Sequence, residues 1–242
     1  MSSPETPPEA PLHGFQGNRI RPVVGDVLPA GLAVAVSREA GARGGTIARR
    51  VGRKLGWQVY NQELLEYISQ EGAFRENLFA TLPARVPQWA EERVEQLVAS
   101  QQLTNDPAIL NLARTIMAVS APGEVVLLGR GAGCILPRES TLHVRIMAPR
   151  HDRIAYMSQW LRLTVAEATE QVRLRDDSRE QFLRTHCRRD PGDIYQYDLL
   201  LNTTLLGEDL SVDLIVQAAK GKQAAYAANV GLSPPGASAP PH

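Results

Sequence analysis

The sequence predicts an α/β fold in which a parallel sheet of about five strands is covered by helices on both faces, in three layers. Short apolar runs recur along the chain and end in polar or glycine-containing turns, as buried parallel strands do. Stretches with helical periodicity separate these runs, and this alternation is typical of parallel βαβ units. The 242 residues, 43% of them hydrophobic, suffice for one domain with a sizeable core.

Five segments are predicted to form the strands of this sheet. Each is short and largely apolar, which fits a strand that is buried on both faces. The segments are 32–36 (LAVAV), 57–60 (WQVY), 124–128 (EVVLL), 142–147 (LHVRIM) and 197–202 (YDLLLN).

Helices are predicted between the strands in the first half of the chain. At 46–55, apolar residues recur at helical spacing and basic residues occupy the other face. The block 62–121 shows helical patterns and no convincing strand, with Asp106 as an N-cap and Pro107 just inside the helix. We expect this block to form a lid or a substrate-binding module on the sheet.

Three more helices are predicted in the second half. The first covers 150–163, directly after the fourth strand. Thr164 and Glu167 then have the spacing of a capping box, which predicts a further helix over 165–186. A closing helix is expected at 210–228.

The two ends of the chain differ in composition from the rest. Residues 1–20 and 231–242 are rich in proline and are predicted to be disordered tails. The domain is therefore expected at 21–230.

Composition argues against several functional classes. Lys and Arg total 26, as do Asp and Glu, so binding to nucleic acid or membranes through overall charge is not expected. Neither the histidines nor Cys134 and Cys187 have metal-ligand spacing, so no metal site is predicted and the cysteines are expected to be reduced. No membrane-spanning run or signal peptide is recognisable, which predicts a cytoplasmic protein of open oligomeric state.

The first predicted strand ends in a glycine-rich stretch, SREAGARGGT, at 37–46. Gly41, Gly44 and Gly45 would let backbone N–H groups turn toward an anion. The helix expected from Thr46 would direct its dipole at the same point. These features are those of a phosphate-binding loop.

The same stretch departs from the P-loop pattern GxxxxGK[ST]. Arg38 stands at the first glycine, Gly44 at the lysine and Gly45 at the Ser/Thr position. Arg38 and Arg43 are candidates for the missing positive charge, and Thr46 provides a hydroxyl one place late. By itself the stretch is equally compatible with a strand-to-helix turn that binds nothing.

A second signal is the arginine in GRGAG, directly after the third predicted strand. Open parallel sheets bind ligands at the carboxyl ends of their strands, where Arg130 would grip a phosphate with its two-pronged guanidinium. The alternative is an arginine in a glycine turn that pairs with a neighbouring side chain.

A third signal is the basic segment after Thr164. Asp176 and Arg179 are i,i+3 neighbours that can pair on one helix face. Arg175 and Arg179 lie four apart and can converge on one polyphosphate, where they would neutralise the charge being transferred. Most such charge runs are solvated helix faces, so this signal gains weight only beside the other two.

These three signals, in this order, resemble the cytidylate kinase-like family, a divergent branch of the P-loop nucleoside monophosphate kinases. The resemblance covers roughly 32–220. The segments that carry it are VAVSREAGARGGTIARRVGRKLG, VYNQELL, VVLLGRGAGCIL, VRIMAPRHDRI, RDDSR and YDLLLNTTLLG.

The resemblance implies a P-loop NTPase-type fold with a helical acceptor-binding insert at 62–121 and an arginine-bearing lid at 164–190. It implies transfer of the γ-phosphoryl group of ATP to CMP or a similar monophosphate, with Mg²⁺ as cofactor. It assigns catalytic or lid roles to Arg130, Arg175, Asp176 and Arg179. The donor phosphates would be held by Ser37, Arg38, Gly41, Ala42, Arg43, Gly44, Gly45 and Thr46.

Three departures from the family pattern keep other functions open. Gly44 replaces the P-loop lysine, Gly131 the aspartate that follows the GR arginine, and Asn61 an aspartate after the second strand. A degenerate kinase fold that senses nucleotide without turnover is therefore the alternative. A third possibility is a kinase for a non-nucleotide metabolite, because the acceptor segment is the least recognisable part of the chain.

Overall fold

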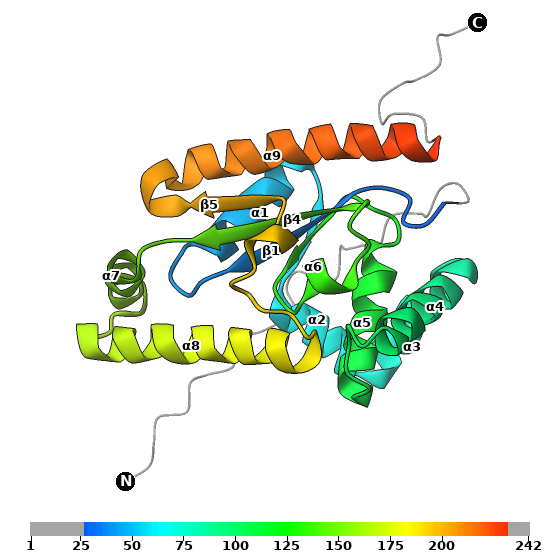
Figure 1. Cartoon of the computed structure of the whole chain (residues 1–242), viewed down its shortest axis with the longest axis horizontal. Coiled ribbons are helices and arrows are strands. Elements are labelled where there is room, and N and C mark those ends of the chain that lie inside the picture. The colour runs from blue at the N-terminus through cyan, green and yellow to red at the C-terminus, as the bar shows by residue number, and fades with distance from the viewer. Residues whose placement is uncertain (1–26, 232–242) are drawn as a thin grey trace, which may run out of the picture.

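A parallel sheet of five strands lies at the centre of the computed structural model, which describes residues 27–231 (Figure 1). The strands stand in the order β2-β3-β1-β4-β5, and all neighbours pair in parallel. The predicted fold class is confirmed. The strands are β1 (Ala33–Arg38), β2 (Gln58–Tyr60), β3 (Val125–Leu128), β4 (Thr141–Met147) and β5 (Leu199–Asn202).

Helices cover both faces of the sheet because its central strand is apolar on both. Along β1, Ala33 and Ala35 belong to one core cluster, while Val34 and Val36 belong to the other. Helices α1 (Gly44–Leu55) and α9 (Thr203–Val230) pack on the valine side. Helices α2 (Gln62–Gln70), α5 (Pro107–Ser120) and α6 (Ala132–Ile135) pack on the alanine side.

The block 62–121 is helical, as predicted. Besides α2 and α5 it contains α3 (Gly72–Ala80) and α4 (Arg85–Ala99), and α4 packs on α5. Asp106 caps α5, since its carboxylate accepts a hydrogen bond from the backbone N–H of Ala108 at 2.9 Å. The role of the block 62–121 in binding an acceptor stays a prediction.

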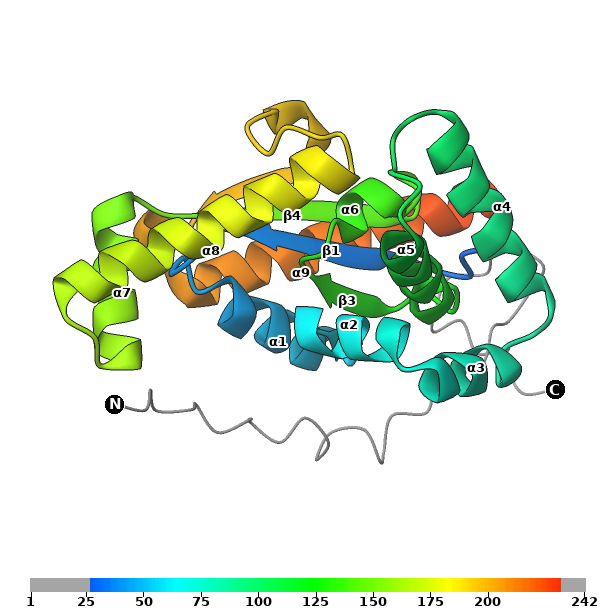
Figure 2. The same ribbon diagram turned by 90° about the horizontal axis from the view of Figure 1, so that it is seen from below.

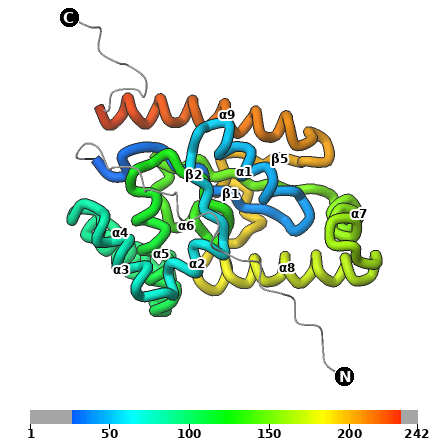
Figure 3. The backbone as a smooth tube through the Cα atoms, turned by 180° about the vertical axis from the view of Figure 1, so that it is seen from behind, coloured from blue at the N-terminus to red at the C-terminus, as the bar shows by residue number. Residues whose placement is uncertain are grey.

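Helices α7 (Arg150–Leu161) and α8 (Val165–His186) form a helical hairpin. Helix α7 lies at the end of the molecule opposite α3 and α4, and α8 runs from there back toward the insert (Figures 2 and 3). The predicted capping box between Thr164 and Glu167 opens α8. A small core of Met157, Ala168 and Val172 joins the two helices, and Ala40 of the glycine-rich stretch packs into it. The hairpin is therefore seated against that stretch.

Two helix starts differ from the predictions, each because of its cap. Helix α1 begins at Gly44 rather than Thr46, since Arg43 is left-handed (φ 60°) and its carbonyl accepts from Ile47 N–H at 3.1 Å. Element α9 begins at Thr203, where the Asn202 side chain caps a first short turn. Gly207 (φ 70°, ψ 174°) then interrupts the helix, so its long part begins close to the predicted residue 210.

The predicted tails at 1–20 and 231–242 lie outside the described residues, except for Gly231 at the end of α9. Between 27 and 231, no helix is both long and apolar enough to cross a membrane.

Candidate active site

One pocket opens where the carboxyl ends of the strands meet helix α8. Open parallel sheets bind their ligands at this edge. Strands β1 and β4, the turn after β3 and helices α7 and α8 all contribute to it. The lining residues are Ser37, Arg38, Glu39, Gln62, Gly129, Arg130, Gly131, Arg145, Arg153, Asp176, Arg179, Glu180, Phe182, Leu183 and Pro191.

The glycine-rich loop lies directly beside this pocket and leads into α1. Gly41 has a φ of +81°, and a Cβ there would lie 2.5 Å from the carbonyl oxygen of Arg153, so only glycine fits. The first turn of α1 leaves the N–H groups of Gly44, Gly45 and Thr46 without intrahelical acceptors. Together with the helix dipole, these donors favour an anion at this point.

Five arginines line the pocket, and three of them come from three different elements: Arg38 at the end of β1, Arg130 after β3 and Arg179 on α8. Burial, followed by the charge of Arg179, lowers the pKa of Arg38 to about 10. Burial also lowers the pKa of Arg179, which the nearby Asp176 opposes and Arg130 reinforces. Cations that repel one another at low solvent exposure indicate a site that an anion completes.

Arg130 also contacts the helical insert. It pairs with Glu66 on α2 and lies over the ring of Phe182, 5.1 Å from the ring centre. Burial raises the pKa of Glu66, against the opposing charge of Arg130. Glu66 in turn lines a second pocket, between α2, α5 and Phe182. The ion pair therefore stands between the loop side of the site and the insert.

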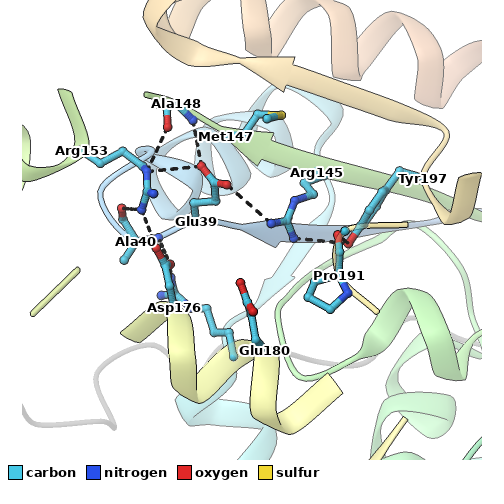
Figure 4. A network of polar contacts seen from close by, with 12 residues as sticks. Glu39, Ala40, Arg145, Met147, Ala148, Arg153, Asp176, Glu180, Pro191 and Tyr197 are labelled. Carbon is cyan, nitrogen blue, oxygen red and sulfur yellow. Dashed lines mark hydrogen bonds and ion pairs between the residues drawn. The ribbon is translucent and has the colours of Figure 1, made fainter. Parts of the chain in front are cut away.

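Arg153 ties α8 to the glycine-rich loop (Figure 4). It is only 8% exposed, and its Nη1 donates to the carbonyl of Ala40 at 3.0 Å and to Asp176 at 2.5 Å. Asp176 also accepts from the backbone N–H of Ala40 at 2.7 Å. The Asp176–Arg179 pair predicted from the i,i+3 spacing is present at 3.6 Å.

Glu39 sits between two of the pocket arginines, as Figure 4 shows. Its carboxylate lies 3.3 Å from Arg153 Nε and 3.6 Å from Arg145 Nη2, and it accepts from Ala148 N–H at 3.2 Å. Arg145 in turn donates to the hydroxyl of Tyr197 at 3.3 Å. These contacts hold the loop, β4 and α7 in one fixed arrangement.

Ser37 is held by a buried histidine. His143 Nδ1 lies 3.0 Å from the carbonyl of Gln196, which can only accept, so Nδ1 carries the proton. Nε2 is then the acceptor for the Ser37 hydroxyl, at 3.0 Å. Burial lowers the pKa of His143 to about 4, although Gln196 and Asp198 oppose the shift.

Of the residues predicted for the site, Ser37, Arg38, Arg130, Asp176 and Arg179 line one pocket. The predicted loop residues 41–46 are not part of its lining. The carbonyl of Ala42 accepts from the Thr203 hydroxyl at 3.2 Å, which fixes the loop to the start of α9.

Two predicted arginines lie outside the pocket lining. Arg43 stacks on Tyr156, 4.9 Å from the ring centre, and pairs with Glu208 at 3.4 Å. Arg175 is exposed on α8. Its charge nevertheless lowers the pKa of Arg179, and does so more than the charge of Arg130. The convergence of Arg175 and Arg179 on one polyphosphate stays a prediction.

The pocket residues fit a bound Mg²⁺ poorly. A divalent cation needs free oxygen ligands, whereas Glu39 and Asp176 are both engaged by Arg153. Glu180, the third lining carboxylate, is exposed and lies 3.8 Å from Arg184. Within residues 27–231, no group of three or more His, Cys, Asp or Glu side chains is placed to hold a metal.

Glu39, Arg145, Arg153 and Glu66 are site residues that the sequence analysis did not single out. Glu39 belongs to the SRE segment, and Arg145 and Arg153 belong to VRIMAPRHDRI. Both segments lie at the C-terminal end of a predicted strand. This position at the carboxyl edge of the sheet is the sequence feature that points to these three residues. Glu66 has no comparable signal, since it lies within an ordinary helical pattern.

Comparison with known proteins fits this geometry. The profile of the cytidylate kinase-like family matches residues 33–205, well over half of the chain. The chain belongs to the cytidylate kinase-like family. Its fold is accordingly that of a nucleotide kinase-like protein.

Individual relatives are distant. A cytidylate kinase from Ignicoccus hospitalis is 23% identical over 184 residues, which cover 75% of this chain and 95% of that protein. A uronate isomerase from Corynebacterium glutamicum is 30% identical over 123 residues. This match covers 51% of this chain but only 24% of that protein. An uncharacterized protein from Eubacterium ventriosum has the same fold, with a TM-score of 0.59, 16% identity and coverage of 78% of this chain and 98% of its own.

Proposed function

We propose that this protein is a nucleotide kinase that transfers the γ-phosphoryl group of ATP to CMP or a similar nucleoside monophosphate. The observation that carries the proposal is the convergence of Arg38, Arg130 and Arg179 in one pocket beside a glycine-rich loop. Phosphoryl transfer is catalysed mainly by positioning the phosphates and neutralising their charge, which is what such a pocket supplies.

The donor phosphates belong on the loop side. Backbone N–H groups at the start of α1 and the guanidinium of Arg38 face the same edge of the sheet, and both favour polyphosphate oxygens. Arg179 reaches the pocket from α8, where it can bridge donor and acceptor phosphates. Mg²⁺ would enter with the nucleotide, held by phosphate oxygens and water more than by this chain.

The acceptor belongs on the insert side, near Arg130. A phosphate acceptor is already ionised and needs no base, whereas a hydroxyl acceptor must lose a proton. Of the three lining carboxylates, Glu39 and Asp176 are engaged by Arg153, which leaves only the exposed Glu180 as a candidate base. This favours a monophosphate acceptor over a hydroxyl-bearing metabolite.

The transfer itself then balances simply. An oxygen of the acceptor phosphate bonds to the γ-phosphorus as the bond from that phosphorus to the β–γ bridging oxygen breaks. ADP leaves with the bond's electron pair, and the acceptor becomes a diphosphate. Arg38, Arg130 and Arg179 would stabilise the charge on the equatorial and bridging oxygens.

Absence of the P-loop lysine motivates a second candidate, a nucleotide-sensing module without turnover. Gly44 stands at that position. A catalytic Mg²⁺ needs free carboxylates, whereas Glu39 and Asp176 are both paired with Arg153. In this reading nucleotide binding would reposition α8, which contacts the loop through Asp176.

Product analysis separates the two candidates. The protein is incubated with ATP and CMP, UMP, AMP or GMP, with cytidine as the control that lacks the phosphate. We expect a diphosphate from at least one monophosphate and nothing from cytidine. Nucleotide binding without product would favour the sensing module, and phosphorylation of cytidine alone would overturn the phosphate-acceptor assignment.

Variants on α8 link the activity to the pocket. Arg179→Ala should lower turnover by about 10²-fold or more, the usual cost of losing one donor to the transition state. Arg173→Ala is the matched control, because Arg173 is exposed on the same helix and pairs with Glu170 and Asp177. Equal activity of the two variants would contradict the assignment.

A further inference from the structure

The side chain of Arg38 occupies space that two glycines leave open. A Cβ on Gly44 would lie 2.6 Å from Arg38 Cβ and 3.0 Å from its Cγ. A Cβ on Gly129 would collide with the guanidinium at Nη1. Arg38 therefore runs from the end of β1 across the start of α1 toward the turn after β3.

The contact with Arg38 explains the glycine at position 44. Gly44 is the first residue of α1, and its φ lies outside the left-handed range, so other residues can adopt its backbone conformation. The three atoms nearest to a Cβ placed there, outside the adjoining backbone, all belong to the stem of Arg38, at 2.6, 3.0 and 3.7 Å. A side chain at 44 and the present position of Arg38 thus exclude each other.

The guanidinium of Arg38 has no partner of its own. Within residues 27–231 it makes no hydrogen bond or ion pair, and the charge of Glu63 only partly offsets the repulsion from Arg179 and Arg130. With a pKa of about 10, Arg38 is still protonated at neutral pH. A desolvated cation without a partner is costly, so its retention indicates an anionic ligand.

We propose that Arg38 performs the task of the absent P-loop lysine, and that arginine and glycine have exchanged places across the loop. In the pattern GxxxxGK[ST], a glycine ends the strand and a lysine from the helix start reaches the β- and γ-phosphates. Here the cation comes from the strand at Arg38, and the glycine is at the helix start at Gly44. The cation enters the same space from the opposite side.

This inference rests on the proposed function, because it assumes that the loop holds a polyphosphate. It adds a geometric consequence that the proposed function lacks. Since the two side chains compete for one space, restoring the usual arrangement requires both Arg38→Gly and Gly44→Lys. Either change alone should fail, for different reasons.

The test is a double-mutant cycle on ATP affinity, measured by calorimetry. Arg38→Gly should weaken binding by roughly 10- to 100-fold, the loss of one charge-assisted interaction with phosphate. Gly44→Lys alone should weaken it at least as much, because the new side chain collides with Arg38. The double variant should recover to within about 10-fold of the native affinity.

Two controls keep the cycle interpretable. Arg53→Ala removes an exposed arginine from the far end of α1 and should leave ATP affinity unchanged. Thermal unfolding of each variant without nucleotide shows whether it is folded. If Gly44→Lys does not fold, the comparison of Arg38→Gly with the double variant still decides.

The inference is overturned if Arg38→Gly binds ATP as the native protein does, or if the double variant binds no better than Arg38→Gly. Failure of the native protein to bind ATP would overturn both the inference and the proposed kinase. ATP binding that follows the cycle without any diphosphate product would uphold the inference and overturn the kinase.

Discussion

The carboxylate of Asp176 on α8 accepts a hydrogen bond from the backbone N–H of Ala40 at 2.7 Å, which joins the predicted lid to the glycine-rich loop. The same carboxylate binds Arg153, whose side chain is almost fully buried. In the structure, the position of α8 and the shape of the loop are therefore coupled through one side chain.

Asp176→Asn should destabilise the fold by roughly 1–3 kcal/mol, because Arg153 loses a buried charged partner. Arg153 keeps its contacts with Glu39 and Ala40, which limits the loss. Urea unfolding measures the effect. Asp177→Asn is the control, since the neighbouring Asp177 is exposed, and equal destabilisation by both variants would contradict the coupling.

Gly41→Ala should cost more stability than Gly56→Ala, although both glycines have positive φ values of 81° and 70°. At Gly41 the added methyl group meets the backbone of Arg153, whereas at Gly56 it meets no atom of residues 27–231 within 4 Å. Backbone strain alone is worth about 1 kcal/mol, and the collision adds to it at Gly41 only. Thermal unfolding midpoints of the two variants check this, and equal shifts would refute it.

Stability should fall as the pH drops from about 6.5 toward 4, because of His143. Its pKa of about 4 in the fold lies below the ordinary 6.5, so over this range the unfolded state binds the additional proton. Stability is thus fully present above pH 6.5 and lost on acidification, by about 3 kcal/mol in total.

Denaturant unfolding at several pH values measures this loss. The slope of stability against pH should be smaller in His143→Gln than in the native protein, whatever the stability of the variant at neutral pH. His151→Gln should keep the native slope, since His151 is exposed on α7. An unchanged slope in His143→Gln would show that other groups cause the acid sensitivity.

Removal of divalent cations should weaken ATP binding only modestly, by about 10-fold or less. The reason is that arginines line the pocket, while Glu39 and Asp176 are engaged and contribute no free metal ligands. Calorimetric titrations in EDTA and in excess Mg²⁺ give the comparison. Loss of measurable binding in EDTA would mean that the metal, not the arginines, holds the phosphates.

Most of the fold could be predicted because its strands are short apolar runs buried on both faces. The alternation of Ala35 and Val36 between the two cores of β1 is the physical basis of that pattern. Helix starts were harder, because the cap of α1 is the left-handed Arg43. Arginine is not a residue that usually signals a helix start.

The site could be predicted in part, for a related reason. Arg38 and Arg130 follow buried strands, and strand ends in a parallel sheet meet at one edge. Sequence could not distinguish Arg38 from Arg43, since the difference arises from a contact between Arg43 and Glu208, far away in α9. Arg153 likewise resembles any arginine on an amphipathic helix until Ala40 and Asp176 are placed beside it.

The central claim is that three arginines hold and neutralise the phosphates of a nucleotide at this pocket. A crystal structure with CMP and a non-hydrolysable ATP analogue tests it most directly. We expect the analogue phosphates within hydrogen-bond distance of Arg38 and Arg179, and the CMP phosphate at Arg130. Phosphates bound elsewhere, with these three guanidinium groups making no contact with them, would contradict it.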